Sequence, residues 1–266
     1  MGFDFGSNFF KIVLVKPANP FQIVENITSK RKTESFMSIG TEDRKFGVDS
    51  YNLATKAPKT TFSSTAHYLG VEFEGTLANK LLENFVMNEF VEDDRGLLAY
   101  QTFTIKDVDD ESEKESSKTI YYTEEMVAQI IGYGKFLAER QAGGPVVDTV
   151  LTVPSYFTQE QRRMLQQSAE IAGLNVIQLV HENTAAALMF GIDRLDSEKD
   201  VNILYYNMGA TDTEVSVVRY SAVADAKNKT FEHVEVLSEA FDKNLGGNDF
   251  DLVLFNIFAD KFNSMP

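Results

Sequence analysis

The chain has 266 residues, of which 43% are hydrophobic, and this is enough for one or two domains with a substantial core. Its 40 acidic residues against 25 basic ones give a formal net charge of −15, which argues against a nucleic-acid-binding protein. The absence of cysteine excludes disulfides, thiol catalysis and cysteine-ligated metals, and no apolar run reaches the ~18–20 residues of a membrane span.

The opening of the chain is β-rich, and strands are predicted over 3–7, 9–15, 21–27 and, as a weaker run, 34–39. Asp4-Phe5-Gly6 places a glycine between the first two strands, which predicts a tight hairpin turn. Glycine suits such a turn because it tolerates positive φ and lets the backbone approach closely. Short helices broken by Pro58 are expected over 48–69.

A block of different composition follows, over about 70–140. Its acidic stretch, 107–118, has no apolar partners and predicts a solvated loop, with cation binding as the alternative. A helix is predicted after it, capped by Thr123 and ended by Gly143-Gly144. The apolar stripe of this helix belongs to the core.

From residue 145 the pattern alternates between strand and helix. A strand over 146–153 ends at Pro154, and Thr158-Gln-Glu-Gln161 is a capping box that opens a helix ending at Gly173. A buried strand is predicted over 176–180. The next helix is opened by Asn183 or Thr184 and is expected to stop at Gly191, before a linker.

The opening pattern then returns, with strands predicted over 201–206, 213–220 and 231–238. A second glycine turn lies at Asn207-Met-Gly209, and a helix begins after Leu245-Gly246-Gly247. The chain therefore reads as duplicated βββαβα units with the second unit truncated, which indicates a fragment. Because consecutive backbone N–H groups cradle phosphate, the two turns predict a nucleotide gripped between two related lobes.

Four segments in order carry a resemblance to a known family: Gly2–Ser7, Val153–Arg162, Ala172–Ala187 and Leu245–Asp251. Along essentially its whole length the chain resembles the nucleotide-binding domain of heat shock protein 70 chaperones. That resemblance implies an α/β protein with the actin-like, ribonuclease-H-like ATPase fold. Within the family the chain is most similar to a large, diverged endoplasmic-reticulum member.

The resemblance also implies a division into lobes. Residues 1–191 would form the first lobe, with an inserted subdomain at about 70–140. Residues 192–245 would form the lower part of the second lobe, and 246–266 the incomplete start of its upper part.

The site residues implied by the resemblance bind ATP or ADP with Mg²⁺. Asp4 would lie near the metal and act in catalysis together with Glu182, on the metal side of the cleft. The remaining positions would contact the nucleotide: Gly6, Ser7, Asn8, Phe9, Gly209, Ala210, Thr211, Gly246 and Gly247. Read from the residues alone, the less favoured alternative for Asp4 is a turn-capping acid. Glu182 is equally a helix N-terminal acid stabilised by the helix dipole. Gly246-Gly247 could be a simple helix-start turn.

Departures from the family pattern predict weak or absent ATP hydrolysis. Asn207 stands where the family has an aspartate, and asparagine supplies no negative charge. Ala66 stands where the family has a lysine that orients the attacking water, with His67 beside it as a less favoured substitute. Ala210 and Thr211 replace glycines and are expected to restrict positive φ and crowd the phosphates.

The predicted function is therefore the ATP-binding domain of a large heat shock protein 70-like chaperone that assists folding in the endoplasmic reticulum, or alternatively in the cytoplasm. Two sequons, Asn26-Ile-Thr28 and Asn228-Lys-Thr230, fit a secretory compartment. Expected partners are a conventional heat shock protein 70 and, through downstream domains, unfolded clients, with no nucleic acid or membrane. The residues that contact adenosine are expected downstream of this chain, so it should hold nucleotide weakly. The alternatives are a nucleotide-exchange partner or holdase for a conventional heat shock protein 70 and, remotely, a sugar kinase of the same superfold.

Overall fold

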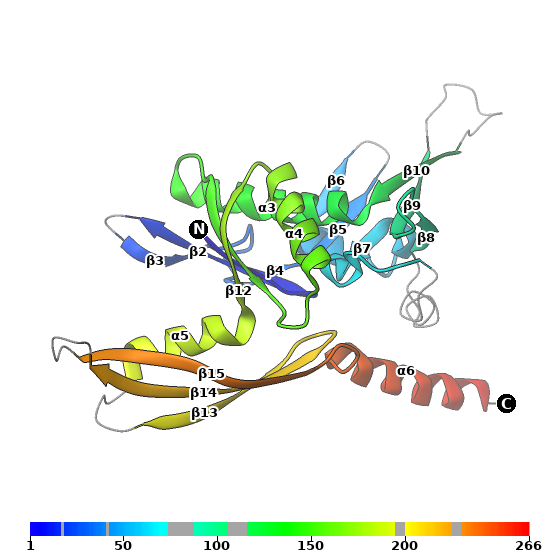
Figure 1. The fold of residues 1–266 in the computed structure, drawn as a ribbon. Coiled ribbons are helices and arrows are strands. Elements are labelled where there is room, and N and C mark those ends of the chain that lie inside the picture. Colours follow the sequence, from blue (N-terminus) through cyan, green and yellow to red (C-terminus); the bar gives the residue numbers. More distant parts are fainter. Residues whose placement is uncertain are drawn as a thin grey trace. The chain divides into compact units, whose positions relative to one another are not determined.

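The computed structural model describes residues 1–16, 19–40, 43–73, 88–105, 116–194, 200–224 and 230–265. They form two compact units (Figure 1). Unit 1 comprises Met1–Leu151 with Thr158–Gln178, and unit 2 comprises Thr152–Phe157 with Leu179–Pro266. Most of the acidic stretch and the sequon asparagine Asn228 lie outside the described residues. Within the described part, no helix has the length and apolar character needed to cross a membrane.

The centre of unit 1 is a mixed sheet whose strands run in the order β12-β11-β1-β2-β3, with β4 paired to β2. β1 pairs antiparallel with β2 and parallel with β11. Side chains alternate between the two faces of a strand, so Phe3, Phe5, Phe10 and Ile12 share the buried face. The strands are β1 (Gly2–Phe5), β2 (Phe9–Lys16), β3 (Asn19–Ile23), β4 (Thr33–Glu34), β11 (Asp148–Val153) and β12 (Asn175–His181).

Two helices pack on this sheet and on each other, α3 (Thr123–Ala142) and α4 (Gln159–Ile171), as Figure 1 shows. Gly143 ends α3 in the left-handed conformation, and the predicted capping box at Thr158 is confirmed. The predicted cap at Thr123 is wrong by one residue. Tyr122 is the N-cap, and its amide donates to the Glu125 carboxylate at 2.8 Å, while Thr123 is buried inside the helix.

Smaller elements complete unit 1. The predicted strand over 34–39 is divided at Ser35, because β4 pairs with β2 while β5 pairs with β6 and β7. The short helices expected over 48–69 are present, but strand β7 separates them. The elements are β5 (Phe36–Ile39), β6 (Arg44–Phe46), α1 (Val48–Tyr51), the 3₁₀ turns η1 (Pro58–Thr60) and η2 (Thr65–Tyr68), β7 (Thr61–Ser63), and the meander β8 (Glu89–Glu92), β9 (Leu98–Ile105) and β10 (Ser116–Tyr122).

Unit 2 repeats the opening meander as an antiparallel sheet of β13 (Val201–Met208), β14 (Thr213–Ala224) and β15 (Thr230–Asp242). Helix α5 (Glu182–Arg194) packs on it through a core of Ala187, Val218 and Tyr220. The predicted stop at Gly191 is wrong, because α5 continues to Arg194, and the helix starts at Glu182. Helix α6 (Gly247–Asn263) follows the sheet, as expected from the repeat.

Asn26, the asparagine of the first sequon, is a buried structural residue. It is only 3% exposed, and its amide nitrogen donates to the Lys32 carbonyl at 3.1 Å. Its Oδ1 accepts from the Thr28 amide, the Thr28 hydroxyl and the Lys30 amide at 2.9–3.0 Å. All of its side-chain polar atoms are therefore used to hold the loop that follows β3.

Replacing Asn26 by alanine is expected to destabilise unit 1 by about 2 kcal/mol, because several backbone groups of the loop lose a part-buried hydrogen bond. Thr28→Val removes only one hydroxyl hydrogen bond and should cost about 1 kcal/mol. Urea unfolding measures both variants. Since both also destroy the sequon, an equal loss in the two would contradict the structural role of Asn26.

Candidate phosphate-binding turns

The first glycine turn joins β1 to β2. The Gly6 amide donates to the Phe9 carbonyl at 3.1 Å, which closes a two-residue loop. A Cβ at Gly6 would lie 2.7 Å from that same carbonyl oxygen, so the position requires glycine for close backbone approach. Positive φ is not the reason, contrary to the expectation from sequence, because neither Gly6 nor Gly209 adopts it.

Three successive carbonyl groups of this turn point towards neighbouring loops of unit 1. Ser35 donates its hydroxyl to the Gly6 carbonyl at 2.8 Å and its amide to the Asn8 carbonyl at 2.9 Å. The Ser64 amide donates to the Ser7 carbonyl at 3.2 Å. Because the peptide unit is planar and trans, the three amides that follow these carbonyls point to the opposite side. Successive N–H groups facing one way form a site suited to an anion.

The second glycine turn, between β13 and β14, closes in the same way. The Gly209 amide donates to the Asp212 carbonyl at 2.8 Å. Its carbonyls also share one side, because the Gly247 amide donates to the Gly209 carbonyl at 3.0 Å and the Asn248 amide donates to the Ala210 carbonyl at 2.8 Å. The structure thus brings the predicted residues 209–211 together with Gly246-Gly247 at the start of α6.

The expected restriction of φ by the non-glycine residues of the second turn has no consequence for its backbone. Ala210 and Thr211 both have negative φ, so replacing glycine at these positions produces no backbone strain. Their amides point away from the carbonyls that α6 engages, which is the arrangement found in the first turn. The two turns are therefore equivalent in their backbone geometry despite different side chains.

Asp4 lies on β1, one residue from each of the buried Phe3 and Phe5. Its carboxylate is about half exposed and forms an ion pair with Lys11 across the hairpin at 3.4 Å. Among the described residues, no group of three or more acidic or histidine side chains is placed to hold a metal ion. Mg²⁺ usually takes one or two carboxylates together with waters and phosphate oxygens, and Asp4 fits that modest role.

Glu182 is the first residue of α5, and Asn207 lies near the end of β13. The Asn207 amide donates to Glu182 Oε2 at 2.9 Å. An aspartate at 207 would instead place a second carboxylate against Glu182, which is unfavourable without a cation between them. Asn207 thus holds Glu182 by a hydrogen bond that needs no ion.

Two further residues at the second turn, Ser155 and Tyr156, lie in the segment Thr152–Phe157, and the sequence analysis gave them no role at the site. The Tyr156 hydroxyl donates to the Asp212 carboxylate, and burial together with that charge raises the pKa of Tyr156. The Tyr156 ring also packs on Phe241 at 5.3 Å, with the Lys243 ammonium over both rings. The alternation of residues leading into β14 could have indicated that Asp212, which directly precedes the strand, shares a face with Glu214.

Glu214, on β14, accepts two hydrogen bonds from the segment Thr152–Phe157. Its Oε1 accepts the Ser155 amide at 2.5 Å and the Ser155 hydroxyl at 2.8 Å. The residue is only 2% exposed, and its Oε2 has no hydrogen-bond partner in the described part of the chain. Burial raises the pKa of Glu214 above its ordinary 4.5 despite the two bonds from Ser155, and the charges of Asp212 and Glu239 add to the rise.

A raised carboxyl pKa means that Glu214 stabilises unit 2 fully only below its unfolded pKa near 4.5, and that this stability is lost as the pH rises through the folded pKa. Glu214→Gln is therefore expected to raise the thermal midpoint of unit 2 at pH 7. The gain should vanish well below pH 4.5, where both side chains are neutral. Glu232→Gln, an exposed change on β15, is the control; a pH-independent gain for Glu214→Gln would contradict the assignment.

Ala66 lies in η2, a 3₁₀ turn of unit 1. Its methyl group has no donor to offer an attacking water. The neighbouring His67 ring lies edge-on to Tyr68 at a centroid distance of 5.8 Å, so it has a packing role. The candidate site therefore has phosphate-binding geometry without the lysine that the family resemblance implies.

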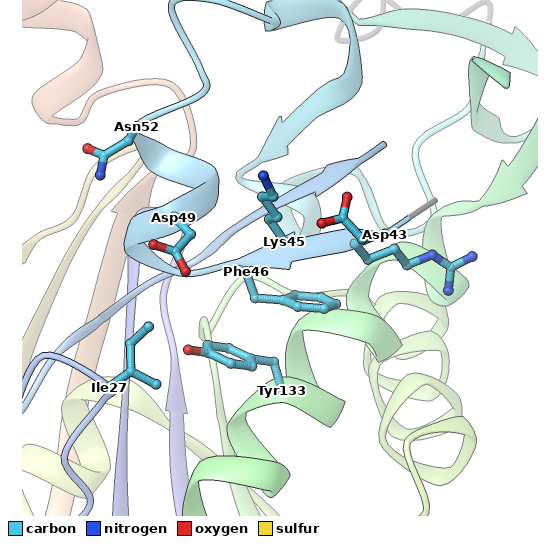
Figure 2. Close-up of a pocket in the computed structure, with 8 residues that line it drawn as sticks. Ile27, Asp43, Lys45, Phe46, Asp49, Asn52 and Tyr133 are labelled. Carbon is cyan, nitrogen blue, oxygen red and sulfur yellow. The ribbon is translucent and has the colours of Figure 1, made fainter. Parts of the chain in front are cut away.

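A separate pocket of about 500 Å³ lies on unit 1 (Figure 2). The rings of Phe46 and Tyr133 stack at 5.1 Å in it, and burial with the nearby Asp49 charge raises the pKa of Tyr133. None of the residues predicted from sequence to bind nucleotide lines this pocket. Its lining is Ile27, Asp43, Arg44, Lys45, Phe46, Asp49, Asn52 and Tyr133.

Comparison with known proteins decides the family. The family described as Hsp70 protein matches residues 1–265. The chain belongs to the Hsp70 family. The actin-like α/β fold expected from sequence is thereby confirmed for this Hsp70-family chain, and the two equivalent glycine turns are its duplicated hairpins.

The relatives of this Hsp70-family chain include several proteins named Hypoxia up-regulated protein 1. It is 33% identical to the Xenopus laevis protein over 268 residues, which cover 99% of this chain and 39% of that one. It is 32% identical to the Danio rerio and Homo sapiens proteins, covering 26% and 25% of their lengths. The predicted similarity to a large, diverged family member is confirmed, and the chain spans a quarter to two fifths of these relatives.

Proposed function

We infer that the chain is the ATP-binding domain of a large Hsp70-type chaperone. The observation that carries this function is the pair of equivalent turns, in which every engaged carbonyl faces the protein and the amides face the other way. Phosphate groups of ATP or ADP bind at Gly6, Ser7, Asn8 and Phe9, and at Gly209, Ala210 and Thr211. Gly246 and Gly247 border the second of these turns.

The side chains at the site support only slow hydrolysis of ATP. Asp4 would be the residue that holds Mg²⁺, and the ion, when bound, would neutralise phosphate charge. Glu182 is oriented by Asn207 at 2.9 Å. With Ala66 in place of a lysine and Asn207 in place of an aspartate, hydrolysis is slow, because loss of one charge-stabilising group typically costs ~10²-fold or more.

The lobe boundaries, compartment and partners belong to the same proposal. The first lobe of this proposal spans 1–191, with the insert at about 70–140, and the second lobe starts at 192, with its upper part from 246. The compact units instead divide between Gln178 and Leu179, which assigns all of α5 to unit 2. The relatives' name, Hypoxia up-regulated protein 1, supports a stress-related protein. The proposed compartment is the endoplasmic-reticulum lumen, and the proposed unfolded clients are bound by regions outside this chain. A conventional Hsp70 of the same compartment is the proposed partner.

A second candidate is a nucleotide-exchange partner with little ATPase of its own. The Asn207–Glu182 hydrogen bond favours it, because this contact keeps the second turn ordered without any cation. Such a partner needs the shape of the domain and only occasional turnover.

Calorimetric titration of Mg²⁺-ATP into the chain tests the primary proposal. Weak binding is expected, with a dissociation constant of about 0.1–1 mM. Gly6→Ala should abolish it, because the added Cβ lies 2.7 Å from the Phe9 carbonyl oxygen, whereas Gly2→Ala meets no atom within 4 Å and should bind normally. Absence of heat with the unaltered chain would overturn ATP binding. Acceleration of nucleotide release from a conventional Hsp70 would then support the exchange role.

A further inference from the structure

The pocket on unit 1 in Figure 2 has no role in the proposed nucleotide site. Its volume of about 500 Å³ falls within the range of sites for small organic ligands. Its lining comes from the loop after β3, from the segment 43–46 that contains β6, from α1 with the residue after it, and from α3. All of these segments belong to unit 1, and none is close in sequence to α6.

One wall of the pocket is a fixed aromatic ring. Tyr133 stacks on Phe46, with 5.1 Å between the ring centroids and 13° between the ring planes. The same ring makes a second stacked contact with Phe136 at 6.3 Å and lies edge-on to the buried Phe10 at 6.5 Å. Three aromatic contacts hold the ring in one orientation, so the Tyr133 hydroxyl has a defined position before any ligand binds.

Gly47 allows α1 to lie against this hydroxyl. It is the N-cap of α1, and its φ is +61°, in the left-handed region. A Cβ on Gly47 would lie 3.3 Å from Tyr133 Cε1 and 3.5 Å from the hydroxyl oxygen. The missing side chain therefore leaves room for Tyr133, and Asp49 follows two residues later in the first turn of α1.

Asp49 and the Tyr133 hydroxyl form a pair of oxygen acceptors. Figure 2 shows the carboxylate and the hydroxyl pointing toward one another, with Ile27 beside them. After burial, the Asp49 charge is the largest cause that raises the pKa of Tyr133, which places the two groups near each other. Within the described part of the chain, Asp49 has no ion-pair partner and the Tyr133 hydroxyl makes no hydrogen bond.

Positive charges lie elsewhere around the pocket. Lys45 and Arg44 are part of its lining, and Arg44 is held at Tyr121 by a hydrogen bond to the hydroxyl at 3.4 Å. The charge of Arg140 also acts on Tyr133, opposite in sign to that of Asp49. Like charges repel, so these cations disfavour a ligand with a second positive charge.

We propose that this pocket binds a small organic monocation, with its ammonium group between Asp49 and the Tyr133 hydroxyl and its apolar body against Ile27 and Phe46. An ammonium group has three donors and no acceptor, which suits a carboxylate together with a hydroxyl oxygen. Ile27 is 45% exposed, and an apolar body would remove its side chain from water. The net charge of −15 attracts a cation from solution. The inference does not depend on ATP binding.

Chemical-shift titration of the full chain with phenethylamine tests the site. Saturable shifts are expected at the amides of Ile27, Gly47 and Asp49, with a dissociation constant of about 0.1–1 mM. The anion 3-phenylpropionate has the same ring and should cause no such shifts, and neutral 2-phenylethanol should bind about tenfold more weakly or worse. Absence of shifts up to about 10 mM phenethylamine would overturn the proposal, as would equal affinity for the amine and the alcohol.

Two matched variants isolate the charge of Asp49. Asp49→Asn preserves the size of the side chain and should weaken phenethylamine binding about tenfold or more, because the ammonium loses its counter-charge. Asp200→Asn changes the net charge equally at an exposed position of unit 2 and should bind like the unaltered chain. Asp49 is exposed, so Asn at this position should preserve the fold, which circular dichroism checks. Equal affinity of Asp49→Asn and Asp200→Asn would refute the site.

Discussion

Replacing Gly134 by alanine is expected to destabilise unit 1 by about 3 kcal/mol, although alanine is the better helix former. Gly134 lies in α3 where the helix meets the central sheet. A Cβ there would lie 2.7 Å from Phe3 Cζ and closer still to Cε2, and 3.1 Å from Ile12 Cδ1. Since Phe3 and Ile12 are almost completely buried, neither side chain can move aside without displacing the core.

Gly132→Ala is the matched control in the same helix. Its added Cβ would meet only the Cβ of Ala172, at 3.9 Å. Relief of glycine's backbone entropy should therefore stabilise the chain by up to about 1 kcal/mol. Urea unfolding compares the two variants, and combining Gly134→Ala with Phe3→Leu should recover part of the loss. If Gly134→Ala were as stable as Gly132→Ala, the close packing of α3 on β1 would be refuted.

Replacing Gly246 by alanine is expected to separate α6 from the second glycine turn, at a cost of about 3 kcal/mol to that contact. The added Cβ would lie 2.5 Å from the Ala210 carbonyl carbon and 2.6 Å from the Thr211 nitrogen, both backbone atoms. The φ of Gly246 is −146°, so alanine tolerates the backbone conformation and the effect is steric. Hydrogen exchange at the Gly247 and Asn248 amides measures the result, because both amides donate to the turn.

Gly247→Ala provides the control, because its Cβ would meet nothing nearer than the Gly209 carbonyl oxygen at 3.7 Å. Amide protection should be retained in this variant and lost in Gly246→Ala. Unchanged protection in both variants would show that the joint between turn and helix tolerates a side chain. Nucleotide affinity should fall together with protection if the turn binds phosphate.

Local sequence signals predicted much of the fold. The Thr158 capping box and the helix end at Gly143 could be predicted because each signal acts within one helical turn. Strand β7 was missed because its three residues gain their conformation from pairing with β5, a partner distant in sequence. The stop at Gly191 was predicted from propensity alone, whereas packing of α5 on the sheet carries the helix through that residue.

The sequence predicted the two glycine turns of the candidate site but not the contacts that hold them. Glycine marked both hairpins, although positive φ is not the reason at either one, and close approach of the backbone requires glycine only at Gly6. The contacts of Ser35 and Ser64 with the first turn were not predictable, because they join backbone groups and short side chains that carry no motif. The Ser155–Glu214 contact likewise depends on tertiary placement.

The two turns differ in what holds their carbonyls, and this difference gives the second turn a mechanical role. The first turn is hydrogen-bonded to other loops of unit 1, whereas the second turn is hydrogen-bonded to the N-terminal start of α6. A 17-residue helix is about 25 Å long, so a rotation of about 10° at Gly246 would move its far end by about 4 Å. A small displacement of the second turn would therefore become a movement several times larger at the far end of α6.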